Sequence, residues 1–142
     1  MSLMLSVIVF SLSGCDTHDK PNSDADSKWI VTHIDFNGGE LITRIDVNSI
    51  NRSGDIAKVW SDSKWTTTDG KIYYNQYRTE IDCKFRVRRK IYQITNNNGV
   101  FDKEYSGPVE KLATEGKTRY QWERMFESDD IDMNEYKLIC QQ

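Results

Sequence analysis

The feature of this 142-residue sequence that most restricts its fold is the alternation of short β-forming runs with turns that favour glycine. Asp69-Gly70 and Asn98-Gly99 are typical of two-residue hairpin turns, because both central residues of such a turn take positive φ. Asn37-Gly38-Gly39 and Ser53-Gly54 mark two further turns. The β-forming runs that these turns separate are 29–36, 40–47, 56–65, 72–77, 81–95, 100–105 and 118–126. They predict an antiparallel β-sheet of about six strands.

The C-terminal segment has a helical pattern instead. Ser128-Asp129-Asp130 favours a helix start, since an Asp or Ser side chain caps the first backbone N–H groups and acidic residues suit the first turn. Met133, Tyr136 and Cys140 then form an apolar stripe at helical spacing. Strands followed by one helix on a single face predict an α+β domain.

The strand expected over 81–95 carries a pronounced charge pattern. Apolar side chains alternate along one of its faces, at Cys83, Phe85, Val87 and Ile91. Basic side chains alternate along the other face, and we call them the basic row: Lys84, Arg86, Arg88 and Lys90. Like charges on one face add their fields, so the basic row is a candidate site for an acidic protein, lipid headgroups or a polyanionic glycan. The alternative is a solvated face balanced by acidic residues of neighbouring strands. Arg89 interrupts the apolar face and indicates a bend or bulge.

The first residues predict export and lipid anchoring. Residues 3–12 are apolar at eight of ten positions, which suits the hydrophobic region of a signal peptide and is too short for a stable membrane-spanning helix. Leu12-Ser13-Gly14-Cys15 follows them and resembles the lipobox of bacterial lipoproteins, in which the Cys thiol takes a diacylglyceryl group and becomes the new N-terminus. We therefore expect a signal peptide over 1–14 and lipidation at Cys15. The alternative is a core helix or strand that ends in a buried Cys.

Residues 16–28 are polar, with four Asp, two Lys and one Pro. Such a segment buries too little apolar surface to offset the entropy lost on ordering, so residues 15–28 are expected to form a flexible tether to a single domain over 29–142. Asp16 follows the lipidated Cys directly, which resembles the signal that retains lipoproteins of enteric bacteria in the inner membrane. The expected location is the cell envelope, either at the outer membrane or on the periplasmic face of the inner membrane.

The chain has three cysteines, and lipidation of Cys15 leaves Cys83 and Cys140 in an oxidising compartment. One disulfide between them is the natural inference, and it would attach the C-terminal helix to the strand that carries Cys83. The alternative is a reactive or metal-binding pair of thiols. No CxxC spacing and no His near either Cys supports that alternative.

Charge and motif content restrict the function. With 19 Lys and Arg against 22 Asp and Glu, the chain lacks the basic excess of a general nucleic-acid binder, so nucleic acid is not an expected partner. No serine-hydrolase, zinc-protease or phosphate-binding glycine motif occurs, and His33 with Asp35 is the pairing that could serve acid–base chemistry. We therefore expect neither an enzyme nor a metal or cofactor.

Aromatic residues make up 11% of the chain, enough either to fill a core or to form a partner surface. Those of the strand region are Trp60, Trp65, Tyr73, Tyr74, Tyr77, Tyr92, Tyr105, Tyr120 and Trp122. Their positions in the sequence leave both uses open.

Several of these residues follow one another in a pattern that resembles a known family. Residues 44–54 (RIDVNSINRSG) lead into Lys58-Val59-Trp60, and then come Ile81-Asp82-Cys83, Tyr92, Trp122 and Cys140. Over residues 29–140, their order and spacing resemble the surface-adhesin protein E family of small Gram-negative lipoproteins. The resemblance implies an antiparallel sheet with a C-terminal helix held by a Cys83–Cys140 disulfide. It also implies adhesion to host proteins and is compatible with a homodimer.

Together these patterns predict a lipid-anchored, non-enzymatic envelope protein that binds another macromolecule through its sheet or its exposed loops. Membrane contact is expected through the lipid anchor, and the partner is expected to be a protein or a polyanion. Host adhesion is the specific version that the resemblance implies. The competing hypothesis is a periplasmic accessory or structural lipoprotein with an envelope partner and no host role, which Asp16 favours.

Lipidation at Cys15 is directly testable. In membrane extracts of cells that make the full chain, we expect mass spectrometry to find an acylated Cys15 at the N-terminus, with residues 1–14 removed. Two or three acyl chains would hold the protein durably in the membrane, because each buried methylene contributes roughly 0.8 kcal/mol. An unmodified Cys15 in a chain that retains residues 1–14 would contradict the lipoprotein hypothesis.

Overall fold

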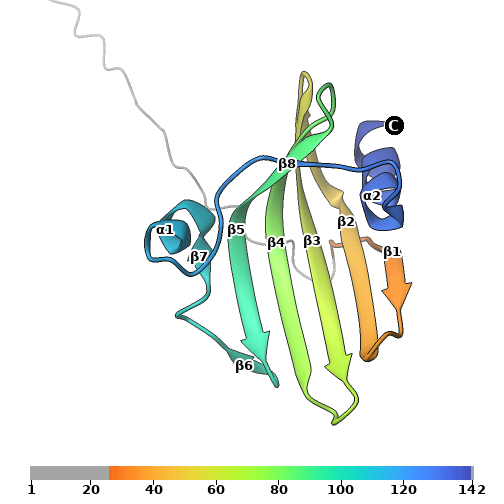
Figure 1. Cartoon of the computed structure of the whole chain (residues 1–142). Coiled ribbons are helices and arrows are strands. Elements are labelled where there is room, and N and C mark those ends of the chain that lie inside the picture. Colours follow the sequence, from red (N-terminus) through yellow and green to blue (C-terminus); the bar gives the residue numbers. More distant parts are fainter. Residues whose placement is uncertain (1–25, 142) are drawn as a thin grey trace, which may run out of the picture.

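Five long strands follow one another along the chain and pair in the same order in the sheet, as short hairpin connections require. The computed structural model describes residues 26–141. Its strands are β1 (Trp29–Asp35), β2 (Gly39–Ser53), β3 (Ile56–Thr67), β4 (Ile72–Asp82), β5 (Val87–Asn97), β6 (Val100–Phe101), β7 (Gly107–Pro108) and β8 (Glu123–Arg124). Its helices are α1 (Val109–Thr114) and α2 (Asp130–Cys140). All strand pairs are antiparallel, and Figure 1 shows a curled sheet with α1 on its β5 side and α2 on its β1 side.

The fold class predicted from the sequence is confirmed, with six strands in series from β1 to β6 and a C-terminal helix. The two-residue strands β7 and β8 lie off this path and both pair with β5. All four glycine turns are where the sequence predicts them. The Asp69-Gly70 turn is not the expected two-residue turn, because four residues connect β3 to β4 and only Gly70 of the pair has positive φ. At the β5–β6 turn, Asn98 has φ 52° and Gly99 has φ 78°, the paired positive values that an Asn-Gly turn needs. The bend expected near Arg89 is a register shift between β4 and β5 that leaves Ile91 unpaired.

One predicted strand is wrong. The run 81–95 contains a turn at residues 83–86, between β4 and β5. Asp82 makes this turn without a glycine, because its Oδ1 accepts hydrogen bonds from the backbone N–H groups of Lys84 (3.0 Å) and Phe85 (3.0 Å). The alternating pattern therefore spans a turn, and the basic row does not lie on one strand face.

Two other expected runs, 100–105 and 118–126, contribute little to the sheet. Each forms a strand of two residues, β6 and β8. Helix α1 lies between them in the sequence. It was not predicted, because Pro108 at its N-cap position has no side chain that can accept a capping hydrogen bond. Val109 and Leu112 are the buried residues of this short helix.

Helix α2 begins at the predicted cap. Asp129 Oδ1 accepts hydrogen bonds from the backbone N–H groups of Ile131 (2.9 Å) and Asp132 (3.1 Å). The helix packs on one face of β1, β2 and β3, where Asn134 Nδ2 donates to the carbonyl oxygen of Thr32 at 2.8 Å. The core on this side consists of Ile45, Ala57, Val59, Ile81, Cys83, Met125 and Ile139.

The predicted disulfide is present between Cys83 and Cys140. It joins the turn after β4 to the last residue of α2, across a sequence separation of 57. The hydroxyl of Tyr136 also donates to the carbonyl oxygen of Cys83 at 3.1 Å. A covalent bond and a hydrogen bond thus hold the C-terminal turns of α2 beside the end of β4.

The predicted signal peptide, the lipidation site Cys15 and most of the expected tether lie outside the described residues. At the described end of that tether, the backbone N–H of Lys28 donates to Asp46 Oδ1 at 2.8 Å, so residue 28 lies against β2. Within residues 26–141, no helix is long and apolar enough to cross a membrane.

Removing the disulfide should destabilise the fold. It closes a loop across a sequence separation of 57, for which restriction of the unfolded chain gives about 4 kcal/mol of stabilisation. We expect the variant Cys83→Ala/Cys140→Ala to lose about this free energy of unfolding in urea titrations. The unaltered protein measured with reductant is the matched control, and it should unfold at the same urea concentration as the variant. An unchanged midpoint in both samples would show that the disulfide is not stabilising.

Candidate functional site

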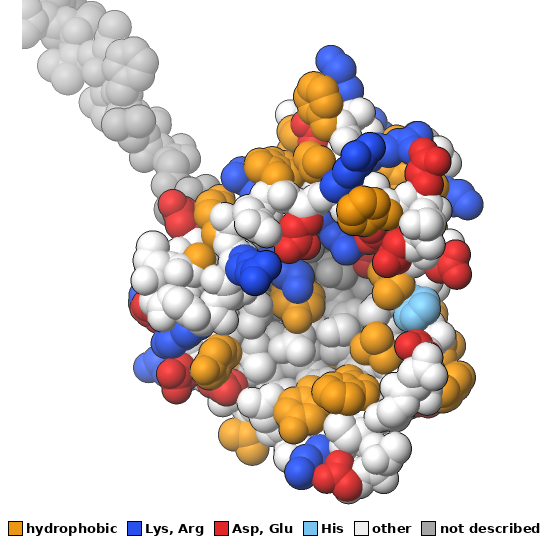
Figure 2. All heavy atoms as spheres, in the orientation of Figure 1, with side chains coloured by type: hydrophobic (Ala, Val, Ile, Leu, Met, Phe, Trp, Pro, Cys, Tyr) orange, Lys and Arg blue, Asp and Glu red, His pale blue; other side chains and the backbone are white. Residues whose placement is uncertain are grey.

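Helix α2 covers only part of the sheet face on which it packs. Side chains alternate along a strand, so Ser61 and Ser63 point to the same side of β3 as the core residues Ala57 and Val59. Figure 2 shows this face hollowed, with mainly backbone and side chains that are neither hydrophobic nor charged at the centre, and hydrophobic and charged side chains around them. We call this region the hollow and define it by Thr43, Ser61, Ser63, Asn75, Tyr77, Lys90 and Gln93.

The hollow is assembled from neighbouring strands by their register. Directly paired residues of antiparallel strands share a face, so Tyr77 of β4 lies between Ser61 of β3 and Gln93 of β5. In the same way, Asn75 of β4 lies beside Ser63 of β3. Residues far apart in the sequence therefore form one polar floor.

Two polar side chains of the floor are unpartnered. Ser61 and Asn75 are half-buried, and neither side chain forms a hydrogen bond within the described part of the chain. Gln93, by contrast, is held in place, because its Nε2 donates to Thr95 Oγ1 and to the carbonyl oxygen of Tyr105, both at 3.1 Å. The hollow thus offers a free hydroxyl and a free amide beside a fixed amide.

Lys90 supplies the positive charge of the hollow. Its Nζ lies 3.8 Å from the centroid of the Tyr77 ring, and among residues 26–141 no carboxylate forms an ion pair with it. The Lys90 side chain stays accessible to water, yet the surrounding walls displace enough solvent to lower its pKa. Burial also raises the pKa of Tyr77 above its ordinary value.

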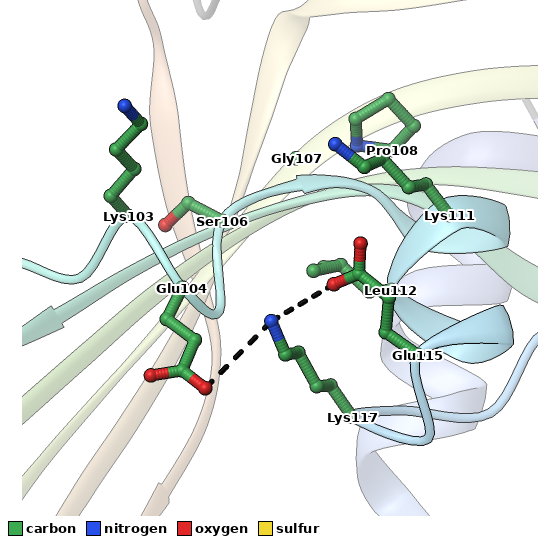
Figure 3. Close-up of a pocket in the computed structure, with 9 residues that line it drawn as sticks. All are labelled: Lys103, Glu104, Ser106, Gly107, Pro108, Lys111, Leu112, Glu115 and Lys117. Carbon is green, nitrogen blue, oxygen red and sulfur yellow. Dashed lines mark ion pairs between the residues drawn. The ribbon is translucent and has the colours of Figure 1, made fainter.

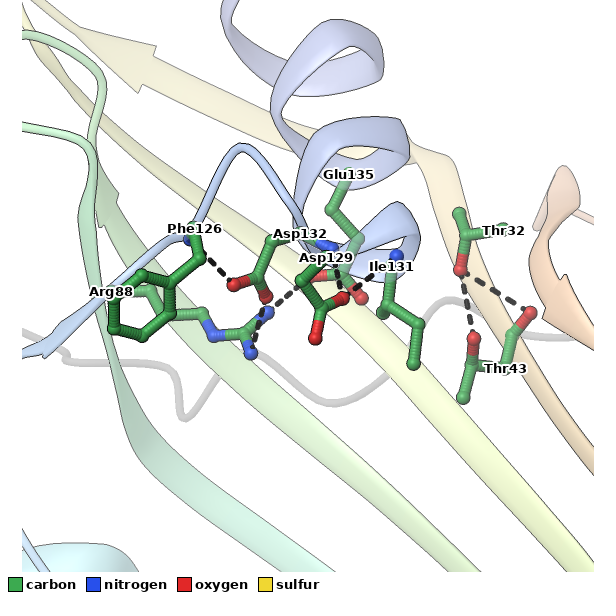
Figure 4. A network of polar contacts seen from close by, with 8 residues as sticks. All are labelled: Thr32, Thr43, Arg88, Phe126, Asp129, Ile131, Asp132 and Glu135. Atoms are coloured by element: carbon green, nitrogen blue, oxygen red, sulfur yellow. Dashed lines mark hydrogen bonds and ion pairs between the residues drawn. The ribbon is translucent and has the colours of Figure 1, made fainter.

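Two positions before Lys90, Arg88 is neutralised by α2 (Figure 4). Its Nη2 lies 2.7 Å from Asp132 Oδ1, and its Nη1 lies 2.8 Å from Glu135 Oε2. Asp132 Oδ2 also accepts the backbone N–H of Phe126 at 2.8 Å. Burial raises the pKa of the Glu135 carboxyl, and the Arg88 cation opposes this shift only in part. The network ties α2 to β5 at the margin of the hollow.

The remaining two members of the basic row lie in the turn between β4 and β5. Lys84 Nζ lies 5.5 Å from the ring centroid of the exposed Phe85. Arg86 forms an ion pair with Glu127, and its guanidinium lies 5.0 Å from the ring centroid of Tyr136. The structure therefore distributes the basic row over a turn, an ion-pair network and the hollow, and it does not bring the four charges together.

The aromatic residues divide between buried and exposed positions. Trp60 is 2% exposed and contacts Tyr92 with ring centroids 6.2 Å apart, on the face opposite the hollow. Trp65 follows Ser63 on the hollow side of β3 and is 44% exposed. Its ring centroid lies 5.7 Å from that of Tyr73, so an aromatic pair marks the end of the hollow away from α2.

A separate depression of about 450 Å³ lies where β7 meets α1 (Figure 3). Lys117 pairs there with Glu115 at 2.9 Å and with Glu104 at 3.8 Å. Figure 3 shows Lys103 and Lys111 directed away from these ion pairs. The charged groups of this depression therefore do not converge on one point.

His33 and Asp35 do not form the acid–base pair that the sequence suggested. Asp35 Oδ1 accepts the backbone N–H of Asn37 at 3.1 Å, and no hydrogen bond joins it to His33, which is paired across the sheet with Thr43. Among residues 26–141, no group of three or more His, Cys, Asp or Glu side chains could hold a metal ion.

Comparisons with known proteins find no match to a family model, a curated protein or a solved structure. The candidate site therefore rests on the geometry of the hollow.

The raised pKa of Glu135 predicts a pH-dependent contribution to stability. Below about pH 4.5 this carboxyl is protonated in both the folded and the unfolded chain, and its contribution is fully present. As the pH rises, the unfolded chain loses the proton first, so stability falls by about 1.4 kcal/mol per pH unit until the folded carboxyl also ionises. Urea unfolding from pH 4 to 8 should show this fall for the unaltered protein relative to Glu135→Gln. A difference that is independent of pH would contradict the raised pKa.

Proposed function

We propose that the protein is a lipid-anchored, non-enzymatic module of the bacterial cell envelope that binds a macromolecular partner in the hollow. The observation that carries the proposal is a concave polar surface with unpartnered side chains at Ser61 and Asn75 and an unpaired ammonium at Lys90. Binding sites are typically concave and combine aromatic side chains with a small number of placed polar groups. The hollow has this composition, and Tyr77 and Trp65 supply its aromatic rings.

The walls of the hollow are held in place before a partner arrives. The Cys83–Cys140 disulfide fixes one end of α2, and the ion pairs of Arg88 fix the other end. A surface that is already ordered loses less conformational entropy when it binds, so more of the contact energy contributes to affinity. This favours a binding role for the concave face.

Anchoring at Cys15 would keep the hollow close to a membrane, with residues 16–28 as the expected tether. The resemblance to the surface-adhesin protein E family supports a host protein as the partner. Asp16 supports the alternative, a periplasmic accessory or structural lipoprotein whose partner belongs to the envelope.

Two neighbouring positions on β3 test the role of the hollow. Successive side chains of a strand point to opposite faces, so a photoreactive amino acid at Ser63 faces the hollow and one at Lys64 faces the other side. In living cells we expect crosslinking from position 63 to capture a defined partner, and the matched control at position 64 to capture none. Equal capture from both positions would contradict the proposal, as would the absence of capture from positions 61, 63 and 75 together.

Protease shaving of intact cells separates the two versions of the function. A surface-displayed domain is cut by added protease, which is the result expected for a host adhesin. A domain that is cut only after the outer membrane is opened supports the periplasmic alternative.

A further inference from the structure

We propose that the occupant of the hollow is an acidic oligosaccharide, bound with a carboxylate at Lys90 and with its sugar rings along the floor toward Trp65. This inference rests on the proposed function and deepens it by naming the chemistry of the partner. Three features of the hollow carry it: a cation without an ion-pair partner among the described residues, a floor of hydroxyl and amide groups, and an aromatic pair at the far end.

The cation is placed to receive an anionic group of a ligand. Lys90 lies against the face of Tyr77 and forms no ion pair with a carboxylate of the described residues. Glu123 and Glu135 attract its charge only from beyond ion-pair distance. The charge of the neighbouring Arg88 is already neutralised by Asp132 and Glu135. Low-dielectric walls focus the field of a charge, so one unpaired cation in a hollow attracts an anion more strongly than it would on a flat surface. A single cation complements isolated negative charges and not a dense polyanion.

The floor between the cation and the aromatic pair matches the hydroxyl groups of a sugar. The Ser61 hydroxyl and the Asn75 amide can each donate and accept hydrogen bonds, as a sugar hydroxyl can. Both side chains are half-buried without a partner among residues 26–141, so water serves them until a ligand binds. A ligand hydroxyl can replace such a water and reproduce its hydrogen bonds.

The aromatic pair offers a stacking surface for a sugar ring. It lies farther from the Lys90 ammonium than one sugar ring can span. Trp65 exposes 44% of its surface beside Tyr73, and the apolar C–H face of a pyranose packs on such rings. Along β4, Tyr73 lies four residues from Tyr77, whose ring the Lys90 ammonium contacts. At about 3.3 Å per residue, the ammonium and the aromatic pair are roughly 13 Å apart. The occupant is therefore a chain of several sugars.

A protein is the other candidate occupant. Protein interfaces are centred on apolar pockets that bury an aromatic or Arg anchor. The floor of the hollow along β3 and β4 is instead polar at Ser61, Ser63 and Asn75. These residues favour the oligosaccharide, and protein binding becomes an outcome of the test.

The test is calorimetric titration of the purified full chain with two tetrasaccharides. One alternates hexuronate with N-acetylhexosamine, and the other is the same compound with each carboxylate reduced to a primary alcohol. We expect saturable binding of the acidic compound and at least about tenfold weaker binding of the neutral one, the effect of one charged hydrogen bond. No saturable binding of the acidic tetrasaccharide, or equal affinity for both compounds, would overturn the inference.

Two lysine variants test whether the saccharide binds at Lys90. Lys90→Met should weaken binding of the acidic tetrasaccharide at least about tenfold. Lys64→Met removes a cation from the opposite face of β3 and should leave the affinity unchanged, which makes it the matched control. Trp65→Ala should weaken binding of both compounds. Equal affinities in the two lysine variants would overturn the assignment, provided that thermal unfolding shows both variants folded.

The inference and the proposed function fail in different ways. Crosslinking of a protein from position 63, together with no tetrasaccharide binding, would overturn the inference and leave the proposed function standing. Absence of any crosslink from the hollow, together with no tetrasaccharide binding, would overturn both.

Discussion

Helix α2 has an apolar side that only the sheet can bury, and its attachment determines which part of the sheet stays open. Ile139 packs into the core with Ile45 and Val59, while the disulfide fixes the last turn beside the end of β4. Arg88 reaches the first half of the helix from β5, so both ends of α2 are held. These two attachments hold α2 over β1, β2 and β3, so the neighbouring part of the concave face stays uncovered.

The residues of β3 change in type where the cover of α2 ends. Ala57 and Val59 lie in the core, whereas Ser61 and Ser63 continue the same face into the hollow. Apolar side chains at these two positions would create an exposed hydrophobic patch, which promotes association. Larger polar side chains would fill the concavity. Small hydroxyl side chains keep the hollow both open and wetted, and this combination suits a surface that exchanges water for a polar ligand.

Local signals predicted the features that depend on a few neighbouring residues. The Asn98-Gly99 turn and the Asp129 cap each act within four positions, so the sequence alone was sufficient to place them. The turn after Asp82 was not predicted, because apolar and basic residues alternate through it without a glycine. The sequence also does not distinguish an Asp that accepts turn hydrogen bonds from an Asp at the end of a strand. The hollow was not predictable, since it depends on the register of several strands and on the curl of the sheet. The disulfide was predictable only from cysteine count and compartment.

The four residues of the basic row look equivalent in the sequence, but in the folded chain they differ in their ion pairs and in their exposure to water. Arg88 forms ion pairs with Asp132 and Glu135 of α2. If Arg88 turned away to bind a ligand, the two carboxylates would be left close together and poorly solvated, at a cost of several kcal/mol. Lys84 lies on an exposed turn, where salt screens its field. Of the four, Lys90 alone combines access to water with surrounding walls and no ion pair within the described chain, and Glu123 and Glu135 act on it only from a greater distance. A charge is available to a ligand when the protein itself does not neutralise it, so the pairing of each basic residue is a better guide to a candidate site than the number of basic residues.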